Sequence, residues 1–198
     1  MLPDKKADTD ADLLAPIADR WSPRALDPTT EITAAQLRTL LEAARWAPSF
    51  GNTQPARYVV GRRGEASFER IFGLLNPGNQ AWAGDAAALL LGVALTGNEK
   101  GELPYAEYGL GLASENLAVQ AVADGLAVHQ MAGFDKAAAR TEFGLPELAV
   151  PLVVIAVGGI GDPGTLSERN RDRELAPRRR VPLAEFAFGD TWEKSAFD

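Results

Sequence analysis

Hydrophobic residues recur along the chain with two different periods, which predict helices alternating with strands. Two segments are apolar at nearly every position, AAALLLGVAL at 86–95 and LAVPLVVIAVGGIG at 148–161. Both are shorter than the roughly 20 residues that span a bilayer, so they are predicted to be strands buried on both faces. A further strand is predicted at 57–61 and a short one at 126–130. The pattern therefore predicts an α+β sandwich around a central, covered sheet.

Elsewhere the apolar residues are spaced three or four positions apart, as on helices that bury one face. The longest such segment, 104–125, is apolar or small almost all round, which predicts burial or pairing with another subunit. Thr33 and Gln36 have the spacing of a capping box, and Pro48 stops the helix that follows them. Segment 76–82 is predicted to be a turn. The predicted helices cover residues 10–22, 33–47, 64–75, 104–125 and 135–144.

A chain of 198 residues usually forms one domain, here predicted at 13–198 behind a disordered tail at 1–12. The formal net charge of −7 argues against general nucleic-acid binding and against adhesion to anionic membranes. The chain has no cysteine and one histidine, His129, which excludes disulfides, thiolate catalysis and a multi-histidine metal centre within one chain. We therefore expect no metal site. The acidic N-terminus does not resemble a signal peptide, so a cytoplasmic location is expected.

Three polar motifs stand outside this pattern. Ala47–Pro55 (APSFGNTQP) places short hydrogen-bonding side chains between two prolines. Arg20–Arg24 (RWSPR) has two arginines and Ser22 at alternate positions, and Arg178–Arg180 (RRR) has arginines at alternate positions. Alternate side chains of an extended segment share a face, and the guanidinium fork holds phosphate oxygens in pairs. The two arginine motifs therefore suit a phosphate or a ribityl chain, although a charge run is more often a solvated surface.

In order and spacing these motifs resemble the signature of the nitroreductase family of FMN-dependent oxidoreductases. R-x-S-x-R matches at Arg20–Arg24, A-P-S-x-x-N-x-Q-P at Ala47–Pro55 and R-x-R-x-P at Arg178–Pro182. The segments GNQAW at 78–82 and GLAVHQMAGF at 125–134 are similar to the family's mid-chain segment and its flavin-edge loop. The resemblance covers nearly the whole chain.

The resemblance implies an α+β fold in which helices flank a mainly antiparallel sheet. It also implies an intertwined homodimer whose C-terminal segments reach over the partner, with FMN at the subunit interface. Pro48, Ser49 and Asn52 are expected to come from the other subunit, whereas Gln54 anchors their loop. The residues implied in FMN binding are Arg20, Trp21, Ser22, Arg24, Pro48, Ser49, Asn52, Asn79, Gln130, Met131, Ala132, Gly133, Arg178 and Arg180.

Within that set the resemblance implies separate roles. Arg178 and Arg180 grip the phosphate, and the arginines and serine of Arg20–Arg24 contact the phosphate, the ribityl chain and the pyrimidine side of FMN. Asn79 hydrogen-bonds the pyrimidine edge. The backbone N–H groups of Ala132–Gly133 lie near flavin N5 and O4.

Other residues near the implied site have roles that the family signature leaves open. Trp82 stands where some family members have a lysine near the flavin edge, so Arg24 is expected to provide the positive charge near flavin N1. His129 has two interpretations: a partly buried side chain satisfied by a backbone carbonyl, or a proton donor at the flavin edge. The suggested substrate contacts, none with a reliable family signature, are Tyr105, Tyr108 and Phe134. The two tyrosines suit ordinary interfacial aromatics equally well.

The implied activity is a ping-pong cycle in which NADH or NADPH delivers hydride to flavin N5 and the flavin then reduces a nitroaromatic, a quinone or a related acceptor. No side-chain nucleophile or base is required, which suits a chain without cysteine. Two alternatives stay open: a non-enzymatic FMN-binding or reservoir protein, and a flavin enzyme of the same fold with different chemistry. A dinucleotide-binding fold is disfavoured because no full G-x-G-x-x-G motif occurs. The sequence identifies neither the acceptor nor the choice between NADH and NADPH.

Overall fold

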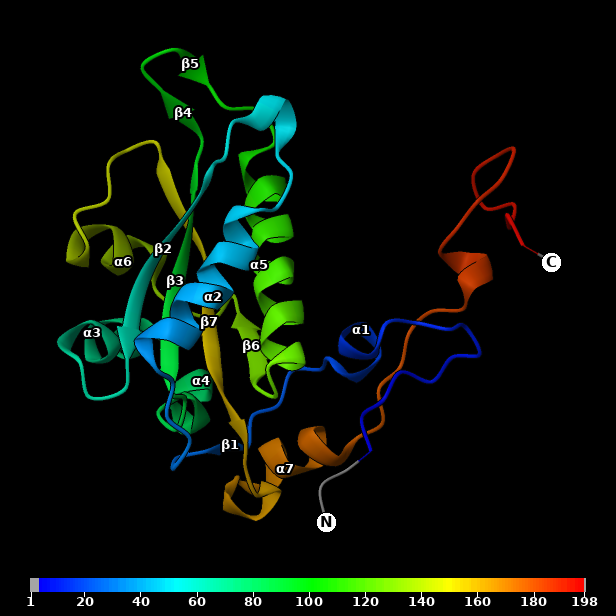
Figure 1. The fold of residues 1–198 in the computed structure, drawn as a ribbon, viewed down its shortest axis with the longest axis horizontal. Coiled ribbons are helices and arrows are strands. Elements are labelled where there is room, and N and C mark those ends of the chain that lie inside the picture. Colours follow the sequence, from blue (N-terminus) through cyan, green and yellow to red (C-terminus); the bar gives the residue numbers. More distant parts are fainter. Residues whose placement is uncertain (1–3, 198) are drawn as a thin grey trace.

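Strand β7 (Ala149–Ile160) is the spine of a five-stranded sheet in the computed structural model, which describes residues 4–197 (Figure 1). β3 (Ala88–Leu95) pairs with β7, and β2 (Ala56–Arg62) pairs with β3. β6 (Ala127–Met131) and β1 (Leu26–Asp27) pair with the C-terminal half of β7. Each of these pairings is antiparallel, so the predicted mainly antiparallel sheet is confirmed.

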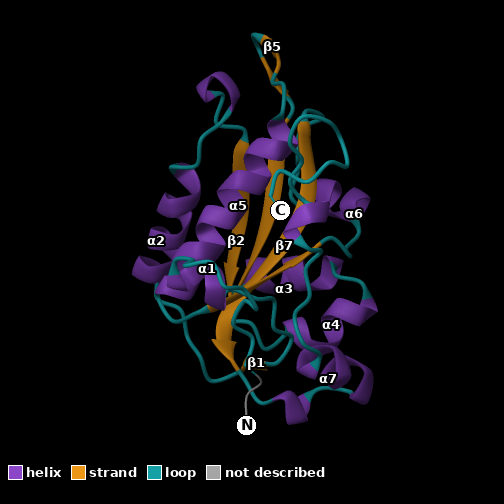
Figure 2. Ribbon diagram, turned by 90° about the vertical axis from the view of Figure 1, so that its right-hand side faces the viewer, coloured by secondary structure: helices purple, strands orange, loops and turns teal. Residues whose placement is uncertain are grey.

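Helices cover both faces of this sheet, as the view along its edge shows (Figure 2). On one face lie α2 (Ala34–Arg45) and α5 (Ala106–Ala123). On the other face lie α3 (Ala66–Leu74), α4 (Pro77–Ala83) and α6 (Lys136–Glu142). Two covered faces explain why the long strands are apolar at almost every position instead of at every second one.

Successive side chains of β3 pack into two hydrophobic cores, one on each face of the sheet. Leu89 and Leu91 pack with α3 and α4, whereas Leu90 packs with α2 and α5. All three leucines are fully buried. Each such side chain contributes about 1.5–3 kcal/mol relative to an exposed position, so the sheet is stabilised from both sides.

Local chemistry sets the two ends of α2. Thr33 Oγ1 accepts a hydrogen bond from the Gln36 N–H at 3.1 Å, and Gln36 Oε1 accepts one from the Thr33 N–H at 3.0 Å. The predicted capping box is thereby confirmed. The helix ends at Arg45, before Pro48, as the restriction on residues that precede proline requires.

Two helices differ from the sequence-based expectation. Residues 76–82 are predicted to be a turn but contain most of α4, because Pro77 sits in the first helical turn, where its missing N–H costs no hydrogen bond. α7 (Glu168–Leu175) lies in the charged tail, where no helix is predicted. Its buried residues, Asn170 and Glu174, are polar, so the helix has no apolar period to reveal it.

The N-terminal segment and the segment after α7 run next to one another, close to α1 (Ala15–Asp19) (Figure 1). Arg178 Nη1 donates to the carbonyl of Lys5 at 2.6 Å, and the Ala7 N–H donates to Ala18 O at 2.8 Å. The chain beyond this contact extends away from the sheet and its helices (Figure 1). Of the tail predicted to be disordered, residues 1–3 lie outside the described residues and 4–12 contain neither helix nor strand.

Short elements complete the chain. β4 (Gly97–Asn98) and β5 (Gly101–Glu102) form a separate hairpin, and one-turn helices lie at Phe50–Asn52, Pro163–Thr165 and Leu183–Glu185. Across the described residues, no helix combines the length and the hydropathy that crossing a bilayer requires. In the same part of the chain, no group of three or more His, Cys, Asp or Glu side chains is placed to hold a metal ion.

Candidate functional site

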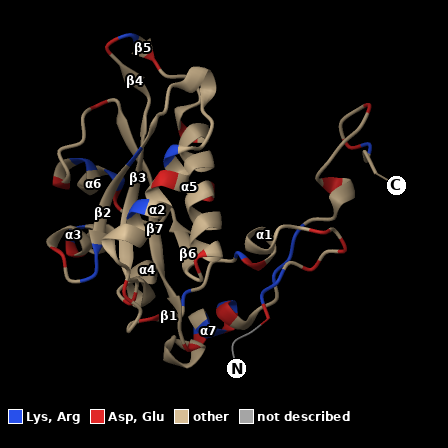
Figure 3. Cartoon of the chain, viewed as in Figure 1, with Lys and Arg blue, Asp and Glu red and all other residues tan. Residues whose placement is uncertain are grey.

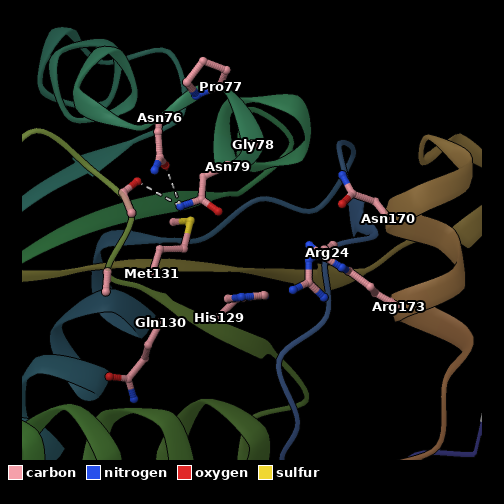
Figure 4. Close-up of a pocket in the computed structure, with 12 residues that line it drawn as sticks. Arg24, Asn76, Pro77, Gly78, Asn79, His129, Gln130, Met131, Asn170 and Arg173 are labelled. Atoms are coloured by element: carbon pink, nitrogen blue, oxygen red, sulfur yellow. Dashed lines mark hydrogen bonds between the residues drawn. The ribbon is translucent and has the colours of Figure 1, made fainter.

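A polar cavity of about 580 Å³ lies where α4, the end of β6 and α7 meet (Figure 4). This volume is within the range of small-molecule sites. Amides, arginines and backbone groups dominate its wall, which suits a ligand with several hydrogen-bonding positions. The lining residues are Arg24, Asn76, Pro77, Gly78, Asn79, His129, Gln130, Met131, Ala132, Gly133, Asn170 and Arg173.

A small hydrogen-bond network fixes the backbone at Gly133. Its carbonyl accepts from the Asn76 N–H at 3.1 Å and from Asn79 Nδ2 at 3.0 Å, and Asn79 Nδ2 also lies 3.3 Å from Asn76 Oδ1. A Cβ at position 133 would lie 2.6 Å from Asn76 Oδ1 and 2.9 Å from Asn79 Nδ2. Only glycine therefore fits at this position without displacing the two asparagines.

The same turn carries two adjacent donors without partners. The hydrogen bonds among residues 4–197 include none donated by the N–H of Ala132 or of Gly133, although both residues line the cavity. Ala132 is exposed and Gly133 is half-buried, so both N–H groups are open to water or to a ligand in the cavity. This pair can therefore bind an acceptor edge of a ligand.

His129 makes the contact with a backbone carbonyl that the first of its two interpretations expects. Its Nδ1 lies 2.8 Å from the carbonyl oxygen of Pro23, so Nδ1 carries the hydrogen and donates it. Burial lowers the pKa of His129 to about 4, the hydrogen bond to Pro23 opposes this shift, and the charge of Arg24 lowers it further. The ring, tilted against Trp82 with centroids 4.5 Å apart, is neutral near pH 7, which disfavours a proton-donor role.

Glu174 of α7 holds the Arg20–Arg24 motif from the other side. Only 1% of Glu174 is exposed, and its carboxylate accepts from the Arg24 N–H (2.9 and 3.1 Å) and the Ala25 N–H (3.0 Å). Burial lowers the pKa of Arg24, the Glu174 charge raises it, and the charge of Arg173 lowers it. Sequence reasoning missed the three α7 residues, whose spacing of three and four positions places Asn170, Arg173 and Glu174 on one helix face.

The remaining arginines of the predicted site form a second group away from the cavity wall. Burial lowers the pKa of Arg178, and the charges of Arg20 and Arg180 lower it further, so both of these arginines act on the Arg178 guanidinium group. Arg20 Nε is 3.4 Å from Glu115 Oε1, and Arg178 Nη1 donates to two backbone carbonyls. Figure 3 shows this basic stretch after α7, beside the N-terminal segment.

Two other residues of the Arg20–Arg24 motif also point elsewhere. The ring of Trp21 lies under Lys5 Nζ, 5.1 Å from the ring centroid, and Ser22 is half-buried without lining the cavity. The motif is thus divided, with Arg24 in the cavity and Arg20 next to Arg178.

The Ala47–Pro55 loop lies at the opposite end of α5 from the cavity (Figure 1). α5 has 18 residues, so it is roughly 27 Å long at 1.5 Å per residue. Ser49 Oγ accepts from the Gln54 N–H at 2.9 Å, which agrees with an anchoring role for Gln54. Within one chain, Pro48, Ser49 and Asn52 are therefore not brought to the cavity.

The suggested substrate contacts lie outside the cavity as well. Tyr105 and Tyr108 are exposed at the start of α5, and the Tyr105 ring centroid lies 5.2 Å from that of Phe50 in the same loop. Phe134 is buried in the hydrophobic core with α3 and α4. Its side chain packs there because it follows the Gly133 turn into the protein interior instead of facing solvent.

Comparisons with known proteins identify a family and similar structures. The model of the nitroreductase family matches residues 17–75 and 74–159. An uncharacterized 15.4 kDa protein in the ask 5' region of Mycolicibacterium smegmatis is 37% identical over 144 residues, which are 69% of this chain and 97% of that protein. The crystal structure of an oxidoreductase containing FMN has a TM-score of 0.88 and 31% identity, over 96% of this chain and 98% of the other. A nitroreductase family protein from Clostridium difficile has a TM-score of 0.67 at 23% identity, over 87% of this chain and 94% of its own.

Proposed function

Because the chain belongs to the nitroreductase family, we propose that it is an FMN-dependent oxidoreductase. Bound FMN would supply the redox chemistry, accepting hydride from NADH or NADPH and passing it to a nitroaromatic, a quinone or a related small acceptor. The protein then needs only to bind the flavin, orient it and exclude competing reactions. The similarity to an FMN-containing oxidoreductase at 31% identity supports this assignment.

The observation that carries the proposal is the donor set of the cavity. The two N–H groups of Ala132–Gly133, without partners in residues 4–197, lie beside Asn79 and Arg24. The isoalloxazine ring has apolar faces and a polar edge of alternating acceptors and donors. Backbone N–H groups, an amide and a guanidinium in one cavity match such an edge. The Gly133 network already fixes the amide of Asn79 and the backbone at Gly133, so these groups require little ordering on binding.

The phosphate is assigned to the second arginine group. The charges of Arg20 and Arg180 both act on Arg178, and the three arginines come from two chain segments that lie side by side. Three clustered guanidinium groups repel one another, so a doubly charged phosphate would stabilise them. Arg178 already holds two carbonyls through Nη1, which leaves its other nitrogen atoms to contact the phosphate.

The site would be completed by a second copy of the chain. The loop with Pro48, Ser49 and Asn52 lies at the far end of α5, so only a partner subunit can bring these residues to the cavity. The segment after α7 carries exposed apolar side chains away from its own body, as expected of a surface that a partner covers. These side chains are Val181, Leu183, Phe186 and Trp192.

The test is an absorbance spectrum of the purified protein, after addition of FMN and removal of the excess, recorded before and after anaerobic NADH or NADPH. We expect flavin bands that bleach with a reductant and return when a nitroaromatic or a quinone is added. Light scattering on the same sample should give twice the chain mass of 21.1 kDa.

Each other result has a defined meaning. Flavin bands that neither reductant bleaches would favour an FMN-binding protein without this activity. Absence of bound flavin, even after incubation with FMN, would overturn the proposed function. A monomer that binds FMN and is reduced would overturn the shared site but retain the oxidoreductase.

A further inference from the structure

Two arginines from distant parts of the chain face the same cavity. Arg24 lies in the segment between α1 and β1, and Arg173 lies on α7 (Figure 4). Within residues 4–197, neither guanidinium group donates a hydrogen bond or forms an ion pair. The Arg24 contacts with Glu174 are made by the backbone N–H. Both charged groups are therefore available to a ligand.

The carboxylate next to them does not neutralise the pair. Glu174 uses its oxygens on the N–H groups of Arg24 and Ala25, and its charge also acts on Lys5. The Glu174 charge thus acts on two cations, Lys5 and Arg24, and the charge of Arg173 adds to that of Arg24. Because burial and the charge of Arg173 both lower the pKa of Arg24, the guanidinium groups are close enough to repel one another. A cavity with surplus positive charge favours an anionic ligand group.

The proposed function provides two candidate anions. One is the FMN phosphate, for which the separate group of Arg20, Arg178 and Arg180 exists. The other is the flavin ring after reduction. Hydride adds two electrons and one proton, so a neutral oxidised ring becomes an anion when NADH or NADPH is oxidised. Asn79, Ala132 and Gly133, which are proposed above to contact the polar edge of the ring, line the same cavity as Arg24 and Arg173. The proposed function therefore assigns this cavity to the ring and not to the phosphate.

We propose that Arg173, together with Arg24, forms a cationic subsite that stabilises the negative charge of the reduced isoalloxazine ring. The inference rests on the proposed function. Electrostatic stabilisation of charge that appears during a reaction acts on the reduced state and has little effect on the oxidised one. Arg173 would thus set the flavin potential more than the affinity for oxidised FMN.

The test compares Arg173→Gln with Arg171→Gln. Both variants remove one positive charge from α7, but Arg171 is exposed and does not line the cavity. We expect Arg173→Gln to bind reduced flavin roughly tenfold more weakly relative to oxidised flavin. For a two-electron couple this lowers the midpoint potential by about 30 mV, measured by equilibration with a reference dye. Arg171→Gln should keep the wild-type potential, and Arg173→Lys should restore most of it because it retains the charge.

Binding measurements distinguish stabilisation of the reduced ring from binding of the FMN phosphate. The dissociation constants of oxidised FMN and of riboflavin, from fluorescence titration, should change by less than about threefold in Arg173→Gln, because the oxidised ring carries no net charge and the phosphate is assigned to the separate arginine group. An unchanged potential would overturn the inference. So would weaker binding of FMN but not of riboflavin, which would assign Arg173 to the phosphate. If wild-type protein binds no FMN, the proposed function itself fails, and that outcome precedes any comparison of variants.

Discussion

Replacement of the buried carboxylate Glu174 by glutamine should weaken the junction between α7 and the Arg20–Arg24 motif. The carboxylate accepts from the Arg24 N–H with both oxygens and from the Ala25 N–H with one. A glutamine can place its single oxygen toward Ala25, but its NH2 group then faces the Arg24 N–H, donor to donor. At least one hydrogen bond to a charged acceptor is lost, which costs about 1.5–3 kcal/mol.

Urea denaturation of the apo-protein at one fixed protein concentration measures this loss. With a slope of about 2 kcal/mol/M, a change of 2 kcal/mol lowers the midpoint by roughly 1 M. Glu168→Gln is the matched control, because Glu168 is exposed in the first turn of the same helix and should contribute no more than about 1 kcal/mol. A Glu174→Gln midpoint equal to that of Glu168→Gln would refute the assigned role of the carboxylate.

Three further predictions follow from the site. Burial lowers the pKa of His129 from 6.5 to about 4, so between these pH values the unfolded chain binds a proton that the folded chain does not. The free energy of unfolding should therefore fall as the pH drops from 6.5 to 4, and His129→Gln should reduce this dependence on pH. Gly133→Ala should weaken FMN binding at least about tenfold in fluorescence titration, because the added methyl group would displace Asn76 and Asn79. The control Gly73→Ala on α3 has open space around its added methyl group and should bind FMN as the wild type does. Arg180→Ala should lower the affinity for FMN but not for riboflavin, and it should leave the free energy of unfolding unchanged. Arg178→Ala should have the same effect on binding and should also lower the free energy of unfolding by about 1 kcal/mol, because the Arg178 side chain donates to two backbone carbonyls.

Most strands and helices could be predicted from the sequence, because their buried residues form recognisable hydrophobic patterns. β3 and β7 are apolar on both faces, and the capping box marks the start of α2. α4 and α7 could not be predicted in this way. Proline at the start of α4 resembles a turn signal. The buried residues of α7 are polar, and one of them, Glu174, pairs with backbone groups roughly 150 residues away.

The site could be predicted in part. Arg24, Asn79 and the segment after β6 were expected in one site, and the structure brings them to one cavity. Asn170, Arg173 and Glu174 were not expected, since a charged, weakly periodic tail gives no sign of which residues it will contact. The loop at Ala47–Pro55 was recognised by its motif, but its position at the far end of α5 leaves its role to a second subunit, which stays a prediction.

α7 connects the two cationic groups of the proposed flavin site. Its inner face carries Arg173 and Glu174, and the chain that leaves it continues directly to Arg178 and Arg180. Because α7 buries polar groups, its docking depends on the Glu174 hydrogen bonds more than on apolar area. Loss of those bonds would displace the charge in the cavity and the phosphate-binding arginines together. Ring and phosphate binding should therefore weaken together in Glu174→Gln, although they should separate in Arg173→Gln and Arg180→Ala.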